Sequence, residues 1–591
     1  MKSVSVFLLI AFLTIACQHS TAQSPDNIRI NQLGYFPEGP KWAIAIGAGE
    51  ASSFYILATG NRDTVFRGVL GPLLSSSNSS LQTRAINFTT LDKEGVYVIS
   101  IPDVGESYPF RIGGRVLGTV VAASLKGYYY QRSGMALEES YAGRWSRPAG
   151  HPDTQVVVHP SAASDKRPAG FILSSPGGWY DAGDYNKYIV NSGITMGTLL
   201  DAYEDFSDYF DTLHTNIPSL RSSSGASVRV PDILNEVLYN LRWMLTMQDP
   251  NDGGVYHKCT NAAFDGMVMP DFTKAPRYVV QKGTAATLDF AAVMAQAGRI
   301  LKKYSASLPG LSDSCLHAAG LAWQWAMQHP DVVYDQEALN RTYTPKVTTG
   351  GYGDRDFKDE FYWAAAELLV STGDDHYRKT IEERIGDPMR LPNWGNVRMM
   401  GDYTLLHWED RLGAKWKTIL HPVRQKIMQM ADEYMVHMDK SAFHTVMGKG
   451  PGDFIWGSNS VAANEGILLI NAWFLTKDKK YVEGALSNLD YLLGRNATGY
   501  CFVTGVGSHS PMHPHHRPSV ADGIEAPVPG LLVGGPNPGM QDRQHYEWTE
   551  PETAYTDKSA AYACNEIAIN WNAPLVYLSG AMEALAGQIG Y

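Results

Sequence analysis

The sequence predicts a mainly α-helical protein in which a small β-sandwich precedes a large domain of paired helices. Short apolar runs bounded by Gly, Pro, Ser and Asn fill residues 24–114, and each run has the length of a strand. Apolar residues then recur at helical spacing over residues 115–591, where long loops rich in Gly, Pro, His and aromatic residues interrupt them. These two patterns divide the chain into two domains at about residue 114.

The strand-like runs are clearest at residues 41–46, 54–58 and 95–101. Roughly six or seven such runs within about 90 residues are typical of a β-sandwich. The pattern leaves open whether this sandwich supports an enzyme or is an adhesion or sugar-binding module in its own right.

The helical pattern is clearest at residues 230–248. Leu234, Leu238 and Leu241 share one face there, and Pro231 stands where the first turn of a helix favours a proline. We expect about twelve helices, paired so that each buries its apolar stripe against a neighbour. They cover residues 120–132, 194–206, 230–248, 284–303, 311–328, 360–370, 375–384, 403–411, 423–437, 461–476, 481–493 and 566–586. No sequence repeat of fixed period is present, so the pattern does not predict a symmetric arrangement.

The net charge argues against a nucleic-acid partner, and the cysteine spacing argues against a zinc site or a disulfide framework. The net charge of -11 comes without basic runs, which argues against nucleic acid, since phosphates require a positive face. Beyond Cys17, the four cysteines lack the close spacing of a zinc site and the chain is too large to need a disulfide framework. We expect Cys259, Cys315, Cys501 and Cys564 to be free and mostly buried.

Residues 1–22 have the pattern of a signal peptide. The apolar run Val4–Ile15 follows a lysine and is too short to span a bilayer. Small residues ending at Ala22 predict cleavage there, whereas Ala16-Cys17 resembles a lipoprotein box and predicts a lipid anchor on Cys17. We expect an exported protein that is periplasmic, secreted or an outer-membrane lipoprotein, and that contacts a membrane only through such an anchor.

The first segment that carries chemistry is Gly177–Lys187. It places Asp181 and Asp184 three residues apart, between glycines that permit sharp turns and aromatic rings such as Trp179 that could stack on a sugar. This combination suits a base that activates water beside a polysaccharide. Asp and Gly also crowd ordinary turns, so the segment alone does not establish a site.

The second segment is Cys501–Arg517, with four histidines between His509 and His516. A metal site is one interpretation, but no Asp, Glu or Cys completes a ligand set at suitable spacing. A loop that hydrogen-bonds sugar hydroxyls fits better, because Arg517 offers a rigid fork of donors and His515 can donate or accept.

The third segment is Tyr555–Pro574. Glu566 stands there at the start of an apolar helix, among Tyr562, Ile569 and Trp571. A carboxyl group removed from water in this way can stay protonated and act as a general acid. The alternative is a glutamate that only stabilises the positive end of the helix.

Together these segments resemble glycoside hydrolase family 9, a cellulase family, in its subgroup with an N-terminal immunoglobulin-like domain. The resemblance runs from about Ile28 to Leu585, and the opening Ile28–Tyr35 is similar to the start of that immunoglobulin-like module. It departs from the family pattern at Cys501 and His509. The resemblance implies an (α/α)6 barrel for residues 115–591, an immunoglobulin-like sandwich for residues 24–114, and hydrolysis with inversion of anomeric configuration.

The resemblance also implies roles for individual residues. It makes Asp184 the general base, Asp181 its partner in holding the nucleophilic water, and Glu566 the general acid. Asp557 is then a supporting carboxylate, and His515 acts at the cleavage point. The expected substrate-binding residues are Arg517, Trp456 as an aromatic platform on the leaving-group side, Tyr562, Trp179 and His516.

The residues that the resemblance implies as metal ligands are only partly present in this chain. Where many relatives bind structural zinc through Cys and Cys-His pairs, this chain has Ser133 and Gly150-His151, so we expect no zinc. Asp359 and Glu360 match part of the family's calcium site, but a later acidic ligand is absent near Asn396. Calcium is therefore possible, the alternative being an acid pair at a helix N-terminus, and no organic cofactor is required.

We therefore predict a monomeric endo-β-1,4-glucanase that binds β-1,4-glucan polysaccharides or oligosaccharides. An exo-acting hydrolase of the same family is the first alternative, and a catalytically silent sugar-binding protein is the second. Cellulose, mixed-linkage glucan, xyloglucan and glucomannan share the linkage. The lack of an attached cellulose-binding module favours soluble or branched glucans.

Overall fold

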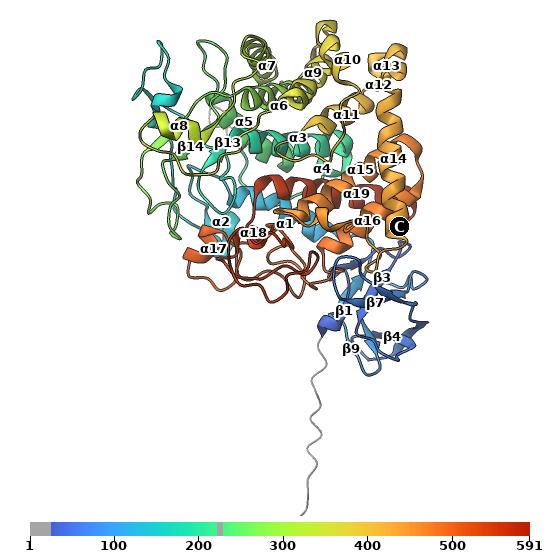
Figure 1. The fold of residues 1–591 in the computed structure, drawn as a ribbon. Helices are drawn as coiled ribbons and strands as arrows, with labels where there is room; N and C mark the ends of the chain where they lie inside the picture. Colours follow the sequence, from blue (N-terminus) through green and yellow to red (C-terminus); the bar gives the residue numbers. More distant parts are fainter. Residues whose placement is uncertain (1–24, 221–227) are drawn as a thin grey trace, which may run out of the picture.

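The computed structural model describes residues 25–220 and 228–591, so the predicted signal peptide and Cys17 lie outside the described residues. A β-sandwich sits against one side of a much larger helical domain (Figure 1). Within the described part of the chain, no helix combines the length and the apolar character needed to cross a bilayer.

The N-terminal domain is a sandwich of two sheets, as predicted. One sheet has the order β1-β3-β7-β6, and the other has the order β2-β10-β8-β4-β5 with β9 paired to β8. The strands are β1 (Ile28–Arg29), β2 (Gly34–Tyr35), β3 (Trp42–Ile46), β4 (Ser53–Ala58), β5 (Thr64–Val69), β6 (Leu73–Ser75), β7 (Gln82–Asn87), β8 (Gly95–Ile101), β9 (Gly105–Glu106) and β10 (Phe110–Ile112). The strongest sequence signals became β3, β4 and β8.

Buried polar contacts fix the sandwich to the helical domain. The Asn31 side-chain amide donates to Asp490 over 2.8 Å, and the Thr83 hydroxyl donates to the Ala442 carbonyl over 2.6 Å. Ile44 of β3 packs with Phe443 in a small apolar cluster at the same boundary. Because these groups are buried and paired, separation of the domains would expose unsatisfied polar atoms as well as apolar surface.

The helical domain is an (α/α)6 barrel, which confirms the expected fold. Outer and inner helices alternate along the chain, and the inner ones follow the order α3, α6, α9, α11, α15 and α19, with α19 packed back on α3. The outer helices are α1 (Gly118–Tyr130), α5 (Asp232–Thr246), α7 (Leu311–Gln328), α10 (Arg378–Arg384), α14 (His421–Met438) and α16 (Lys479–Leu492). The inner helices are α3 (Ile189–Asp205), α6 (Thr284–Leu301), α9 (Lys358–Thr372), α11 (Arg398–His407), α15 (Ser458–Thr476) and α19 (Ile569–Ile589).

The inner and outer helices differ in how much of their surface is buried. Inner helix α6 is buried over almost its whole length, whereas outer helix α14 buries only Val423, Ile427, Ala431 and Met438. Outer helices therefore show the amphipathic stripe that the sequence reveals, and inner helices are apolar on most faces. Shorter helices lie between them: α2 (Glu139–Ala142), α4 (Ser207–Phe210), α8 (Gln336–Thr342), α12 (Glu409–Leu412), α13 (Ala414–Ile419), α17 (Arg517–Ala521) and α18 (Tyr562–Asn565).

A third sheet, in the helical domain, was not predicted. Its order is β12-β11-β15-β14-β13, with bounds β11 (Val156–Val158), β12 (Ile172–Leu173), β13 (Lys187–Tyr188), β14 (Lys258–Asn261) and β15 (Arg277–Val279). These strands are two to four residues long. β13 and β14 carry buried lysines instead of an apolar alternation. The sheet joins two long loops to the segment that holds Asp181 and Asp184.

Candidate active site

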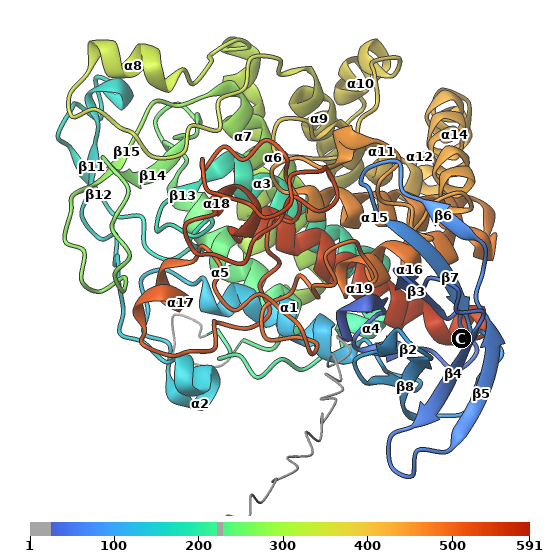
Figure 2. The ribbon, with the colours of Figure 1, turned by 60° about the horizontal axis from the view of Figure 1, so that its bottom comes forward.

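The three motif segments meet at one end of the barrel, where the C-terminal loops lie in front of the inner helices (Figure 2). Ala182 bridges to Ala568, and His515 bridges to Glu566. A Cβ at Gly183 would come within 2.2 Å of the His515 carbonyl oxygen. A glycine is therefore required at that position for the first and second segments to approach each other.

Asp181 is buried and fully hydrogen-bonded. The Asn191 amide donates to Oδ1 over 2.6 Å, and the Tyr352 hydroxyl donates to Oδ2 over 2.7 Å. Burial, together with the neighbouring Asp184, nevertheless raises the pKa of Asp181 to about 8. The protonated form of Asp181 is therefore favoured at neutral pH.

Asp184 receives all its hydrogen bonds on one oxygen. Oδ2 accepts from the Asn186 backbone N–H and from the Tyr188 hydroxyl, each over 3.3 Å, and also from the Asn186 side-chain amide. These bonds fix the plane of the carboxylate and leave Oδ1 for a water. The residue is held where a general base needs to be, close to Glu566 and Asp181.

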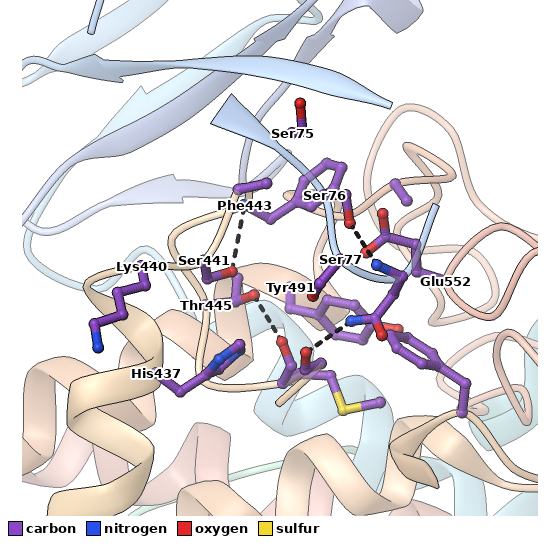
Figure 3. A pocket seen from close by; sticks show the side chains of 16 residues that line it. Ser75, Ser76, Ser77, His437, Lys440, Ser441, Phe443, Thr445, Tyr491 and Glu552 are labelled. Carbon is purple, nitrogen blue, oxygen red and sulfur yellow. Dashed lines mark hydrogen bonds between the residues drawn. The ribbon is translucent and has the colours of Figure 1, made fainter. Parts of the chain in front are cut away.

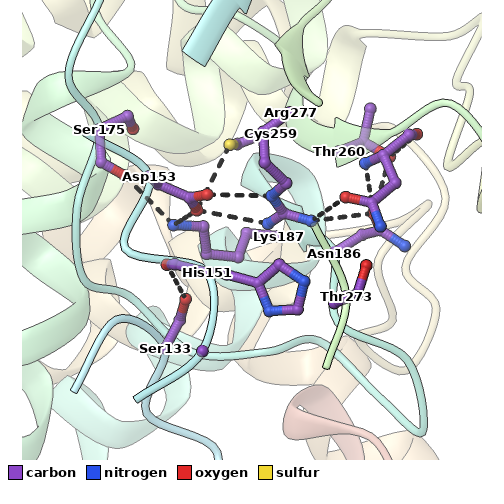
Figure 4. A network of polar contacts seen from close by, with 12 residues as sticks. Ser133, His151, Asp153, Ser175, Asn186, Lys187, Cys259, Thr260, Thr273 and Arg277 are labelled. Carbon is purple, nitrogen blue, oxygen red and sulfur yellow. Dashed lines mark hydrogen bonds and ion pairs between the residues drawn. The ribbon is translucent and has the colours of Figure 1, made fainter. Parts of the chain in front are cut away.

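The orientation of the Asn186 amide is itself determined by its surroundings. Its Oδ1 accepts from the Thr260 hydroxyl over 2.9 Å, from the Asn261 backbone N–H over 2.8 Å and from the Arg277 guanidinium over 3.3 Å (Figure 4). Three donors require an oxygen at that position, so the NH₂ group must face Asp184. β14 and β15 thus orient the candidate base through one side chain.

Glu566 does not lie on helix α19, contrary to the expected helix 566–586. Residues 566–568 are extended and form bridges to His515, Val533 and Ala182, and α19 begins only at Ile569. Burial raises the pKa of Glu566 well above its usual range, and the carboxyl groups of Asp184 and Asp181 raise it further. A half-buried carboxylic acid that stays protonated can donate a proton to a leaving group.

His515 and Arg517 flank the carboxylates. His515 Nδ1 lies 2.6 Å from the Ser559 carbonyl, so Nδ1 carries the hydrogen, and burial lowers the pKa of this imidazole. Its Nε2 is thereby an acceptor for a sugar hydroxyl. The Arg517 guanidinium donates to the Gly183 carbonyl over 2.7 Å and to the Asp265 carbonyl over 3.0 Å.

Asp557 organises the loop that carries His515. Its carboxylate accepts from the backbone N–H of Met512 over 2.7 Å, from that of His513 over 2.9 Å and from the Asn565 side chain over 2.9 Å. Asn565 immediately precedes Glu566. Asp557 therefore supports the positions of His515 and Glu566 from behind.

Trp456 and Tyr562 form an aromatic pair beside these groups. Their ring centroids lie 5.4 Å apart, and Tyr562 is also 5.7 Å from the His515 ring. Trp456 is 40% exposed, which leaves its face open to a sugar ring.

Comparisons with known proteins decide the family. A model of Glycosyl hydrolase family 9 matches residues 118–579, and a model of the Cellulase N-terminal ig-like domain matches residues 23–106. The chain belongs to glycoside hydrolase family 9. The β-sandwich is accordingly the immunoglobulin-like domain of that family.

Relatives of this family 9 enzyme match over nearly the whole chain. This chain is 44% identical over 587 residues to a xyloglucan-specific endo-β-1,4-glucanase of Bacteroides ovatus, and the match covers 99% of this chain and 98% of that protein. It is 31% identical over 576 residues to endoglucanase D of Acetivibrio thermocellus, covering 96% and 84%. A solved family 9 structure from Bacteroides ovatus matches with a TM-score of 0.89 at 43% identity, covering 95% of this chain and 100% of that one. The predicted class, an inverting glycoside hydrolase of the endoglucanase type, is confirmed.

Two residues expected to bind substrate do not fit that role. Trp179 is fully buried, packs on Tyr128 and donates its indole N–H to Glu236 over 3.3 Å. His516 is also buried, and its ring nitrogens pair with Ser519 and Gln131 over 2.9 Å each. Motif positions next to catalytic residues were interpreted as contacts, but both side chains point into the core of the domain.

Their actual role is structural. Gln131 Oε1 accepts from the His516 Nε2–H over 2.9 Å, and Gln131 Nε2 donates to the Ala182 carbonyl over 3.0 Å, so His516 supports the Asp181–Asp184 turn through Gln131. Burial lowers the pKa of His516 to about 3, which keeps the ring neutral.

An aromatic group beside Asp181 was missed by the sequence analysis. Tyr352 lies 4.8 Å from Tyr188 and 5.2 Å from Trp394, measured between ring centroids. Tyr188 and Tyr352 also hydrogen-bond the two aspartates. The aromatic residue after Lys187 was a usable signal, but Tyr352 and Trp394 lie in loops whose proximity no local pattern reveals.

Ser133 and His151, where the sequence predicts no zinc ion, lie beside a buried ion-pair network (Figure 4). Asp153 contacts the Lys187 ammonium at 2.6 Å and the Arg277 guanidinium at 3.0 Å, and the Ser133 hydroxyl donates to the His151 carbonyl over 3.3 Å. Burial alone would raise the pKa of Asp153, but Arg277 and Lys187 outweigh it and lower the pKa to about 2. The donor set of Ser133 and His151 lacks thiolates, so it does not fit a structural zinc ion.

The candidate calcium residues lie in the first turn of α9. Asp359 accepts the Val397 backbone N–H over 2.7 Å, and burial raises the pKa of Glu360, with Asp359 and Asp289 adding to the effect. Across residues 25–220 and 228–591, no three His, Cys, Asp or Glu side chains converge as metal ligands. A calcium ion at Asp359 and Glu360 stays a prediction.

A cavity of about 220 Å³ lies elsewhere, between the β-sandwich and the barrel (Figure 3). Asn78, Phe443 and Tyr491 are among its lining residues, and none of the candidate catalytic residues lines it. The carboxylate cluster, and not this cavity, is therefore the candidate active site.

Proposed function

We propose that this family 9 enzyme hydrolyses the β-1,4-glucan backbone of xyloglucan by endo attack, with Asp184 as general base and Glu566 as general acid. The observation that carries the proposal is the meeting of two carboxyl groups in different surroundings. Asp184 Oδ2 accepts hydrogen bonds from the Asn186 backbone N–H and the Tyr188 hydroxyl, whereas burial and the neighbouring carboxyl groups raise the pKa of Glu566.

In the proposed reaction a water held by Asp184 attacks the anomeric carbon. The water proton passes to Asp184, the glycosidic C–O bond breaks, and Glu566 gives its proton to the departing oxygen. The neutral Asp181 holds the water from the other side. His515 and Arg517 bind hydroxyl groups at the cleavage point, and Trp456 with Tyr562 supports the leaving-group sugar. No organic cofactor takes part.

Xyloglucan is favoured over other β-1,4-glucans by similarity. The Bacteroides ovatus relative named for xyloglucan shares 44% of its residues with this chain over nearly the full length of both. The relative at 31% identity is named only as an endoglucanase. The higher identity supports a shared substrate.

We also propose that the enzyme acts outside the cytoplasm as a monomer, either free or anchored through a lipid on Cys17. The support is the pattern of residues 1–22 and the polymeric substrate, which does not enter cells intact. Fractionation of cells that express the wild-type chain or Cys17→Ser tests the anchor. Membrane association that is unchanged by Cys17→Ser would contradict it.

A panel of soluble polysaccharides tests the substrate and the mode of attack together. Viscosity, reducing ends and product sizes are followed on xyloglucan, mixed-linkage glucan and glucomannan. We expect a rapid fall in xyloglucan viscosity at a low yield of reducing ends. A slow fall with early release of one short product would establish exo action instead, and no hydrolysis of any β-1,4-glucan would contradict the proposal.

A further inference from the structure

The loop between β14 and β15, residues 262–276, presents a cluster of exposed apolar side chains. Phe264 is 49% exposed and Phe272 is 73% exposed, and Met267 and Val268 between them are exposed as well. Large exposed apolar residues elsewhere on the described chain stand singly or in adjacent pairs in the sequence. Several exposed apolar side chains on one short loop are typical of a surface that contacts a partner.

This loop is held rigidly although it exposes apolar groups. Asp265 accepts from the Asn261 amide over 2.6 Å and from the Thr273 hydroxyl over 2.5 Å, which closes the loop on itself. The Tyr185 hydroxyl donates to the Val268 carbonyl over 2.6 Å. A fixed loop pays no ordering entropy when it binds, so its exposed rings form a preorganised surface.

The loop is continuous with the active site through Arg517. The Arg517 guanidinium donates to the Asp265 carbonyl and to the Gly183 carbonyl, and it lies 5.7 Å from the centre of the Phe264 ring. Ring contacts link Trp456 to Tyr562 and Tyr562 to His515, and Arg517, two positions after His515, contacts Phe264. Phe264 therefore lies against a side chain that also contacts the turn carrying Asp184.

The contact between Phe264 and Arg517 indicates what the loop binds. The glucan backbone must pass Asp184 and Glu566, and the Arg517 side chain separates Phe264 from the turn that carries Asp184. Because Arg517 lies between the Phe264 ring and the glucan backbone, Phe264 can contact only groups that project sideways from that backbone. Branch sugars project in this way, and the C–H face of a pyranose packs on an aromatic ring.

We propose that the β14–β15 loop is a docking surface for the branch sugars of the polysaccharide, with Phe264 and Phe272 as its aromatic contacts. The proposal rests on the proposed function, because it assigns the branches of xyloglucan to a surface beside the same active site. The loop thereby favours a decorated glucan over a bare one.

The test compares variants on branched and unbranched substrates. Phe264→Ala, Phe272→Ala and the double variant are assayed on a xyloglucan oligosaccharide and on cellohexaose, with Val436→Ala on outer helix α14 as an exposed apolar control. We expect kcat/KM on the branched substrate to fall about 3- to 10-fold for each single variant, mainly through KM. The loss on cellohexaose is at most about two-fold, and Val436→Ala changes neither.

Three outcomes would overturn the proposal. Equal losses on both substrates would assign the loop to the backbone, and unchanged kinetics of the double variant would remove it from substrate binding. A wild-type dimer that the double variant converts to monomer in sedimentation would make the loop a self-association surface. If the wild type itself fails to cleave xyloglucan, the proposed substrate is wrong irrespective of the loop.

Discussion

Two buried carboxylate clusters in this barrel differ in how their charges are matched. Asp153 lies between Lys187 and Arg277, and the pKa of its carboxyl is lowered to about 2. A short distance along the chain, Asp181 lies beside another carboxyl group without a cation, and its pKa is raised to about 8. Burial is similar at Asp153 and Asp181, so the partners decide the protonation state.

The difference separates structural from functional roles. A buried carboxylate paired with two cations gains stability from its charge and has no free lone pair directed at substrate. Adjacent carboxyl groups that form no ion pair raise one another's pKa, which can supply an acid and a base at the same pH. The two clusters are linked through Arg277 and Asn186, so the paired cluster orients the unpaired one.

The largest expected effect comes from removing either reacting carboxyl group. Asp184→Asn and Glu566→Gln should each lower kcat on polysaccharide by about 10²- to 10⁴-fold. Asp184→Asn removes a buried charge and Glu566→Gln replaces one neutral group with another, so thermal unfolding should show a Tm equal to or above that of the wild type. A clear fall in Tm for both variants would show that these carboxylates stabilise the fold as Asp153 does.

The next effect breaks the paired cluster. Asp153→Asn leaves two buried cations without their counter-charge and should lower the free energy of unfolding by about 3–5 kcal/mol, measured by denaturant titration at pH 7. Arg62→Ala, which removes an exposed ion pair with Glu106, is the control and should leave Tm unchanged. An Asp153→Asn protein as stable as the wild type would contradict the structural role of the network.

The same variant has a defined pH dependence. The folded-state pKa of Asp153, about 2, lies below its unfolded value of about 3.9, so the ionised carboxylate stabilises the fold above pH 4. This contribution is lost as the pH falls from about 4 toward 2. The stability difference between wild type and Asp153→Asn should therefore shrink over that range, and a difference that grows would contradict the assignment.

A smaller effect tests the link between the clusters. Asn186→Ala removes one of the three donors to Asp184 Oδ2, the side-chain amide, while the backbone N–H and the Tyr188 hydroxyl remain. It should lower kcat about 10- to 100-fold with little change in KM. Thr260→Val removes one of three donors that orient Asn186 and should cost less. Equal effects of the two variants would contradict an orienting role for the amide.

The smallest effect concerns Asp181. Because its pKa of about 8 keeps it protonated at pH 6, Asp181→Asn replaces one neutral group with another of the same shape. We expect kcat at pH 6 to fall about 10-fold or less, far less than for Asp184→Asn. If both variants are equally inactive across the pH range, Asp181 acts as an ionised group.

The fold was predictable because its signals are local. Helical spacing of apolar residues marked each of the twelve barrel helices, and the run at residues 95–101 coincides with β8. The β11–β15 sheet was missed because its strands are short and carry Lys187 and Arg277, whose burial depends on Asp153 far along the chain. Periodicity cannot report such a pairing.

The candidate site was likewise predictable only in part. Asp181, Asp184 and Glu566 lie in sequence motifs that identify them as candidate catalytic residues. The motifs do not show which neighbouring side chains are buried, and for that reason Trp179 and His516 were misassigned. The orienting role of Asn186 depends on donors 74, 75 and 91 positions away in the chain. Only the folded chain shows that its oxygen is already occupied.

The central claim, that Asp184 and Glu566 have different roles, is tested most directly with two substrates that differ only in leaving group. The dinitrophenolate of 2,4-dinitrophenyl β-cellobioside leaves without needing a proton, whereas the sugar that leaves a cello-oligosaccharide must be protonated. We predict that Glu566→Gln loses kcat/KM on the oligosaccharide but stays close to the wild type on the activated substrate, while Asp184→Asn loses both. Equal losses of Glu566→Gln on the two substrates would contradict its assignment as the general acid.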